Sequence, residues 1–74
     1  MRVIEEGQLQ GSFEGFKNYD VVFKFFGGRK FKQDEYKYNY YYSYMPRAKV
    51  VEEVGQMYLR VDGMTERVKV KLIY

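Results

Sequence analysis

The sequence predicts an all-β domain, a small barrel of about five antiparallel strands ending in a three-stranded meander. Tyr and Phe make up 20% of the 74 residues, and aromatic side chains favour strands over helices. Apolar and polar residues alternate with the two-residue period of strands that bury one face. Turns containing glycine interrupt that alternation roughly every eight to twelve residues. We therefore expect a single domain, residues 1–74, without a sustained helix.

The first strand is expected at residues 9–16. Alternation points Leu9 and Phe13 toward the core, and Gly11 and Gly15 allow bends or a close approach of another backbone.

The second strand, residues 21–26, should turn Val21, Phe23 and Phe25 inward. A three-residue hairpin loop at 27–29 then returns the chain. The register expected from this loop pairs Phe25 with Phe31 and Lys24 with Lys32.

The tyrosine-rich stretch 36–44 is predicted to be the next strand. Its tyrosines fall on even positions, whereas the earlier inward residues are odd. We therefore expect a bulge after Asp34-Glu35 that switches the inward parity, so that the even tyrosines face the core. On this interpretation Tyr36, Tyr38 and Tyr40 fill the barrel.

A nine-residue strand spans about 30 Å, which is longer than the sheet of a small barrel. One end of the stretch 36–44 should therefore protrude. Protruding tyrosines are good contact residues, because they bury a large area at little rotamer cost and keep a polar tip. Tyr41, Tyr42 and Tyr44 are the predicted contact surface for a protein partner or a second copy of the chain.

The last three strands form a meander whose register follows from keeping every apolar residue on one face. Its turns are expected at Val54-Gly55 and at residues 63–66. The expected pairs are Ala48 with Val61, Val50 with Leu59, Leu59 with Val70, Val61 with Val68, and Met57 with Leu72.

The opposite face of this meander carries a predicted row of Lys49, Arg60 and Lys69, beside Tyr58 and Lys71. Like charges directly opposite in a sheet are unfavourable unless an anion lies among them. The row therefore suggests a surface for single-stranded nucleic acid, with Tyr58 as a stacking platform. The alternative is a solvated face whose long cationic side chains find nearby carboxylates. The net charge of +3 favours this alternative.

No catalytic, metal or cofactor site is predicted. The chain lacks His and Cys, and its few hydroxyl residues have no predicted base beside them. Adjacent acid pairs such as Glu52-Glu53 point to opposite faces of a strand. No apolar run has membrane-spanning length and the first residues do not resemble a secretion signal. We expect a cytoplasmic protein.

The pattern of an aromatic strand, a glycine hairpin, an aromatic-x-Gln and a Tyr-x-Tyr-x-Tyr stretch resembles small uncharacterised bacterial proteins with SH3-like barrels. The residues that carry it are 23–33, 36–40, 45–46, 61–63 and 68–70. This resemblance implies an SH3-like barrel and no activity. Many relatives have Trp where this chain has Phe31.

Residues 9–16 leading into 21–26 are also similar, over about a third of the chain, to the Sm-like RNA-binding barrels. No binding residue is carried over from that likeness, because the second half lacks a matching motif. An OB-type barrel is disfavoured, since OB-folds are longer and commonly carry a helix.

Two functions follow. The leading one is a non-enzymatic module that binds a protein partner, or itself as a weak homodimer, through exposed tyrosines or an open sheet edge. The alternative is single-stranded nucleic-acid binding through Lys49, Tyr58, Arg60, Lys69 and Lys71.

Overall fold

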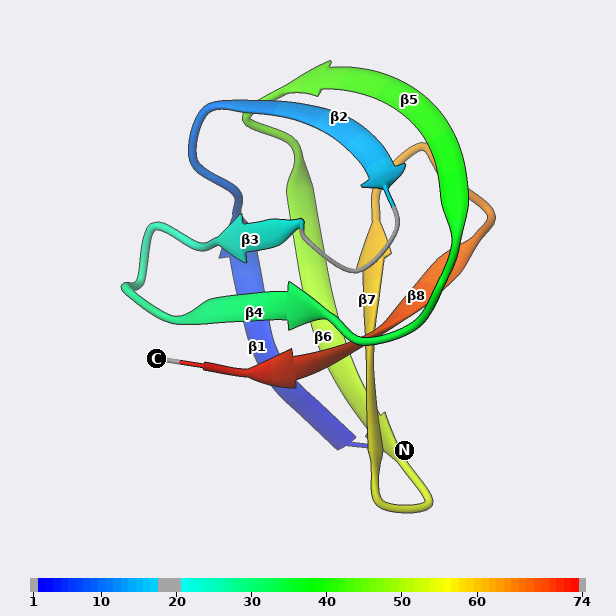
Figure 1. Cartoon of the computed structure of the whole chain (residues 1–74). Helices are drawn as coiled ribbons and strands as arrows, with labels where there is room; N and C mark the ends of the chain where they lie inside the picture. Colours follow the sequence, from blue (N-terminus) through cyan, green and yellow to red (C-terminus); the bar gives the residue numbers. More distant parts are fainter. Residues whose placement is uncertain (1, 18–20, 74) are drawn as a thin grey trace.

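The computed structural model describes residues 2–17 and 21–73, which form eight β-strands and no helix able to cross a membrane. Six strands make one antiparallel sheet in the order β1-β6-β7-β8-β4-β3, and β2 and β5 pair as a separate two-stranded ribbon (Figure 1). The strands are β1 (Arg2–Gln8), β2 (Ser12–Lys17), β3 (Val22–Lys24), β4 (Lys30–Gln33), β5 (Tyr38–Tyr44), β6 (Arg47–Glu53), β7 (Gln56–Val61) and β8 (Arg67–Leu72).

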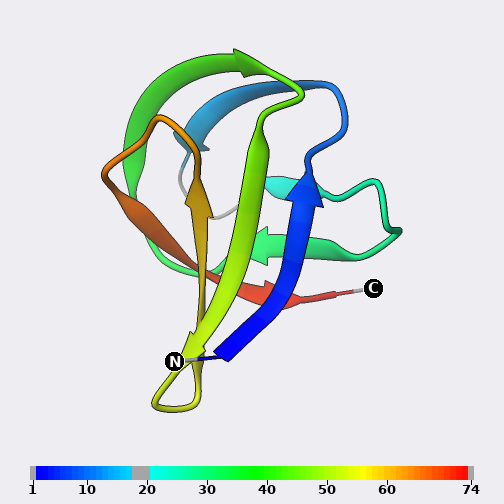
Figure 2. The ribbon, with the colours of Figure 1, turned by 180° about the vertical axis from the view of Figure 1, so that it is seen from behind.

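The prediction of an all-β domain is confirmed, but the expected number of about five strands is wrong. Strand β1 was not expected, because its sequence does not alternate: Glu5 and Glu6 are adjacent, and a bulge lies between Val3 and Glu5. It pairs along β6, as the view from behind shows (Figure 2). The described strands do not pair into one closed cylinder.

Two segments beyond the edge strands nevertheless meet. Leu9, just after β1, forms an isolated bridge with Phe25, just after β3. The Gln10 N–H donates to the Lys24 carbonyl at 2.8 Å, and the Phe26 N–H donates to the Gln8 carbonyl at 3.0 Å. The two ends of the six-stranded order are therefore joined locally.

The core lies between the six-stranded sheet and the β2–β5 ribbon, which arches over it in Figure 1. Phenylalanines dominate it. Phe16 and Phe23 meet edge to face at 6.1 Å between ring centroids, as do Phe25 and Phe31 at 5.7 Å. Leu9 and Phe13 are buried as predicted. Such packing gives a short chain large buried areas without disulfides.

The hairpin between β3 and β4 has the predicted loop length but begins one residue earlier. Phe23, not Phe25, lies opposite Phe31. The Gly28 N–H donates to the Phe25 carbonyl at 3.0 Å, and the third loop residue is Gly28, with φ of 101°. Three-residue hairpins need a positive φ at that position, which glycine adopts freely and the expected Arg29 does not.

The predicted register of the meander is correct for β6 with β7 and wrong for β7 with β8. Val50 faces Leu59 and Ala48 faces Val61, as predicted. Between β7 and β8, however, Leu59 lies opposite Val68, and Met57 opposite Val70, so the register is two residues away from the prediction. The hairpin is centred one residue earlier than predicted, because the Met64 N–H donates to the Val61 carbonyl and closes a turn there. A shift of two leaves every side chain on its predicted face.

The predicted orientation of the tyrosines is wrong. All the even tyrosines of residues 36–44 are exposed, and Tyr41 instead packs partly against the core. Inward parity does not switch after Asp34-Glu35. It switches at Met45, which has a left-handed φ of 48° and precedes the buried Pro46. The phenylalanines already fill the interior, and a buried tyrosine would also need a partner for its hydroxyl.

Candidate functional site

Basic side chains collect on the outer face of the six-stranded sheet. Alternation about the buried Phe23, Phe31, Leu59 and Val68 turns nine of the thirteen Lys and Arg residues outward. They are Lys24, Lys30, Lys32, Arg47, Lys49, Arg60, Arg67, Lys69 and Lys71.

Four pairs of these cations lie directly opposite one another on neighbouring strands. Each such pair costs roughly 0.2 to 1 kcal/mol relative to a neutral pair. The pairs are Lys24 with Lys30, Lys32 with Lys71, Lys49 with Arg60, and Arg60 with Arg67.

On the β6–β7 side, acidic groups compensate this charge. Arg67 forms an ion pair with Glu53 at 3.1 Å, and Glu6 lies opposite Lys49 on β1. The Arg67 guanidinium also covers the ring of Tyr58 at 4.0 Å from its centroid. Tyr58 is partly buried, so it is not the open stacking platform that the sequence suggested.

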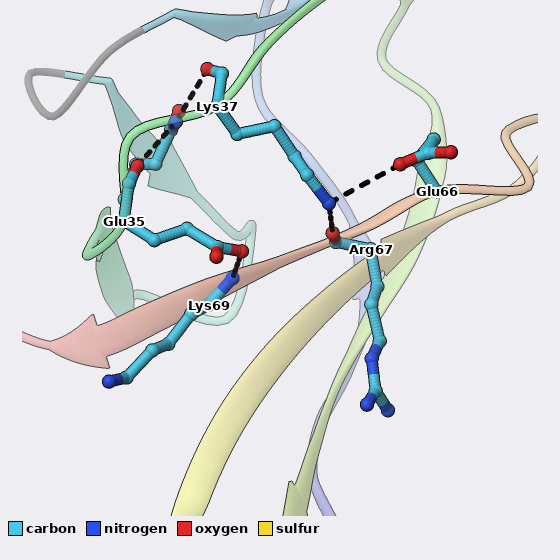
Figure 3. A network of polar contacts seen from close by, with 6 residues as sticks. Glu35, Lys37, Glu66, Arg67 and Lys69 are labelled. Carbon is cyan, nitrogen blue, oxygen red and sulfur yellow. Dashed lines mark hydrogen bonds and ion pairs between the residues drawn. The ribbon is translucent and has the colours of Figure 1, made fainter.

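On the β3–β4–β8 side, three of the described lysines lack such compensation. Within the part of the chain that the structure describes, Lys24, Lys32 and Lys71 form no ion pair. Lys69 is held by its backbone, whose N–H donates to Glu35 Oε1 at 2.8 Å, while its ammonium points away (Figure 3). We call the outward lysines of these three strands the lysine band: Lys24, Lys30, Lys32, Lys69 and Lys71.

The observed strand register therefore separates the residues of the predicted basic row. Lys49 and Arg60 do meet, but Lys69 lies opposite Tyr58, and Lys71 lies opposite Lys32 on β4. Lys30 and Lys32 are absent from the predicted row, because the predicted sheet does not pair β4 with β8. The alternation of Lys30 and Lys32 around Phe31 was the available signal.

A second surface is formed by the even tyrosines, which we call the tyrosine ladder. They lie on alternate positions along β5 and the residues just before it, and β5 bends so that its outer face is convex (Figure 1). The exposed fractions are 71% for Tyr36, 68% for Tyr38, 63% for Tyr40, 55% for Tyr42 and 66% for Tyr44.

The predicted contact residues divide between the two faces of β5. Tyr42 and Tyr44 belong to the exposed ladder. Tyr41 points inward, and its hydroxyl lies against the backbone of Gly63. Tyr41 therefore anchors the strand that presents its neighbours.

Strand β2 supports the ladder from beside. Gly15 lies opposite Tyr40 at an irregular register, with φ of 97°, and any Cβ there would collide with the Asn39 carbonyl oxygen. Lys17 lies opposite Tyr38 and donates to Glu14 Oε1 at 2.8 Å. The hydrogen bond, and then the attraction between the charges, lower the pKa of Glu14 and raise the pKa of Lys17. The flank of the ladder is thus electrically neutral.

The ladder and the lysine band meet at β8. The Asp34 N–H donates to the Lys69 carbonyl at 2.7 Å, and Lys37 Nζ donates to the Arg67 carbonyl at 2.6 Å and pairs with Glu66 at 3.3 Å (Figure 3). Tyr36, the first rung, lies between these two attachments in the sequence.

The buried side chain of Gln33 fixes this junction. Its Oε1 accepts from the Lys17 N–H at 3.1 Å, and its Nε2 donates to the carbonyls of Glu35 at 3.0 Å and Lys37 at 2.9 Å. One side chain therefore ties β4, the end of β2 and the start of the ladder together. It is the only buried polar residue in the described chain.

A cleft of about 170 Å³ separates β2 from β3, with Phe13 and Phe23 among its lining and Glu14, Lys17 and Lys24 at its polar positions. Among residues 2–17 and 21–73, no group of three or more acidic or other ligating side chains could hold a metal ion.

Comparison with known proteins returns no match to a protein-family model, to a curated protein or to a solved structure.

Proposed function

We propose that this domain is a non-enzymatic binding module that holds single-stranded nucleic acid against the lysine band. The observation that carries the proposal is the direct opposition of Lys32 to Lys71, neither of which forms an ion pair with a described residue. Folding brings these ammonium groups together at a cost in free energy. A phosphate between them would turn that cost into attraction.

The shape of the band favours a polymer over a small anion. Its lysines lie on the outer side of three neighbouring strands. A cleft of about 170 Å³ between β2 and β3 includes only Lys24 of the band, and one of about 70 Å³ around Arg47, Lys49 and Asp62 includes none of it. A sheet face without a deep pocket gives each phosphate few contacts, so affinity must come from several phosphates of one nucleic-acid strand.

The net charge of +3 understates the local charge of the band. Several carboxylates of the described residues form ion pairs with cations outside the lysine band. These pairs are Glu5 with Arg29, Glu14 with Lys17, Glu52 with Arg2, and Glu66 with Lys37.

Fluorescence anisotropy of a labelled oligothymidine of about fifteen nucleotides tests the proposal at several salt concentrations. Affinity should fall steeply with salt, because phosphate neutralisation releases counterions. In Lys32→Gln/Lys71→Gln the slope of log affinity against log salt should shrink by about 0.7 if the two lysines share one phosphate, and by about 1.4 if each holds its own.

The matched control is Arg2→Gln/Arg29→Gln, which removes the same charge from residues paired with carboxylates near β1. Its slope should stay close to that of the unaltered chain. If the oligonucleotide does not bind at low salt, the proposal fails.

For the fold, we propose an SH3-like barrel. The antiparallel meander β6-β7-β8 and the bridge between Leu9 and Phe25, which links the two ends of the six-stranded order, support it. The likeness of residues 23–33 and 36–40 to the bacterial SH3-like proteins remains a prediction.

The second candidate is a protein contact through the tyrosine ladder, including Tyr42 and Tyr44. The observation in its favour is area: the exposed tyrosine surface is on the order of 600 Å² per chain, with its flank neutralised by the Glu14–Lys17 pair. Two copies would bury about 1,200 Å², the lower end of stable interfaces. Sedimentation velocity over a wide concentration range tests self-association, and a constant monomer would exclude it.

A further inference from the structure

We infer that the tyrosine ladder stacks the bases of the same nucleic acid whose phosphates the lysine band holds, which makes the module selective for single strands. This inference rests on the proposed function and extends it to a second surface. Its basis is the continuity of the two surfaces, the spacing of the rungs and the curvature of β5.

Continuity comes from the attachment of residues 34–37 to β8. Hydrogen bonds from Asp34 and Lys37 reach the backbone of Lys69 and Arg67. The first rung, Tyr36, therefore begins where the band ends on β8. The junction that a strand leaving Lys69 would cross carries the Asp34, Glu35 and Glu66 carboxylates. Glu35 accepts from the Lys69 N–H, and Glu66 pairs with Lys37.

The spacing of the rungs suits a chain of stacked units. Residues two apart on a strand are separated by about 6.6 to 6.8 Å and point to the same side. Every even position of β5, from Tyr38 to Tyr44, is a tyrosine, with one register irregularity between Tyr40 and Ser43, and Tyr36 precedes the strand. Aromatic side chains stack any base, since each base has a π face, so the surface would tolerate sequence variation.

The curvature of β5 selects a flexible ligand. Figure 1 shows the strand arching around the outside of the molecule, whose longest extent is 29 Å. Duplex DNA has a persistence length of about 150 base pairs and cannot follow such an arc. A single strand can follow it, and its bases are free to stack because they are unpaired.

The same curvature disfavours a second copy as the occupant. Two convex ladders facing each other touch over only a few rungs, so most of the tyrosine area would stay exposed. A polyanion is attracted by the band instead.

The test compares two double variants of exposed ladder tyrosines. One variant loses the aromatic rings and the other keeps them. Tyr40→Thr/Tyr42→Thr removes two stacking faces and retains strand propensity, whereas Tyr40→Phe/Tyr42→Phe retains both faces. The probes are the labelled oligothymidine, the same sequence annealed to its complement, and inorganic polyphosphate of similar charge. Circular dichroism checks that every variant is folded.

The Thr variant should bind oligothymidine at least about tenfold more weakly with an unchanged salt slope, from stacking losses of about fivefold or more per base. The Phe variant should bind like the unaltered chain, and polyphosphate should bind all three equally. The chain lacks Trp, so its emission comes from tyrosine. The single strand should quench that emission more than the duplex does.

Equal oligothymidine affinity of the Thr and Phe variants would overturn the inference while leaving the salt-dependent binding of the proposed function intact. The inference would also be overturned if the Thr variant lost polyphosphate binding as strongly as oligothymidine binding. Polyphosphate has no bases, so the tyrosines would then contribute to anion binding and not to base stacking. A third outcome would overturn both proposals: the unaltered chain binds no oligonucleotide but forms oligomers that the Thr variant does not form. The ladder would then be a contact with a second copy of the chain.

Discussion

Lys32 of β4 lies directly opposite Lys71 of β8 on the outer face of the sheet, and neither forms an ion pair with any described residue. The inner face of the same two strands holds buried Phe31 on β4 and buried Val70 on β8. Packing on one side therefore forces two ammonium groups together on the other. The free chain carries this repulsion as a cost in stability.

Reversing one of these charges should stabilise the free protein. Lys71→Glu turns a like-charge pair into an opposite-charge pair, and we expect the free energy of unfolding to rise by about 1 kcal/mol at low salt. The gain should shrink as salt screens it. Urea denaturation at two ionic strengths measures both effects, and a loss of stability at low salt would contradict the repulsion.

Replacing Gln33 should damage the junction between the strands. Gln33→Leu keeps the volume but leaves the Lys17 N–H and the carbonyls of Glu35 and Lys37 without their partner. Each unsatisfied buried group costs about 1 to 3 kcal/mol, so a loss of at least about 2 kcal/mol is expected. Gln10→Leu, which removes one bond from an exposed residue, is the control. Thermal melts of similar midpoint for both variants would show that the Gln33 network contributes little.

Gly15 should not tolerate a side chain. In Gly15→Ala the new methyl group meets the Asn39 carbonyl oxygen and the Tyr41 backbone nitrogen, in addition to the strain of a positive φ. Gly11→Ala has a positive φ but nothing within 4 Å, so it isolates the backbone strain. We expect about 1 to 2 kcal/mol of destabilisation at Gly11 and distinctly more at Gly15. Equal losses in chemical denaturation would contradict a close approach of β2 and β5.

The turn between β6 and β7 carries avoidable strain. Val54 has φ of 51° and is fully exposed, followed by Gly55 with φ of 77°. A two-residue hairpin with both φ values positive favours Asn-Gly, and a β-branched residue is strained there. Val54→Asn should stabilise the protein by about 1 kcal/mol without loss of a packed contact. A lower melting temperature would show that the side chain of Val54 has a structural role.

Alternation could predict which residues lie inside, but it could not determine register everywhere. Val50, Leu59 and Val68 are buried as expected, because a shift of two residues preserves the face. The pairing of β4 with β8 links segments almost forty residues apart, and the sequence contains no turn that marks it. The predicted basic row was therefore displaced, and the lysine band was found only in the structure.

The tyrosines show the limit of composition. The sequence shows that the tyrosines share one face of the strand. Whether that face points inward or outward depends on which residue has the left-handed backbone conformation. That residue is Met45, not a position near Asp34-Glu35, and nothing in the type of residue 45 indicates it. The phenylalanine core leaves no room for the even tyrosines, a fact of packing that emerges only when the strands are assembled.

Amide chemical-shift mapping of the ¹⁵N-labelled chain with oligothymidine at low salt tests the central claim most directly. The largest shifts should fall on β4 and β8 around Lys32 and Lys71, and continue along β5 from Tyr38 to Tyr44. Shifts confined to β1 and β6, or no shifts at saturating oligonucleotide, would contradict nucleic-acid binding by the lysine band and the tyrosine ladder.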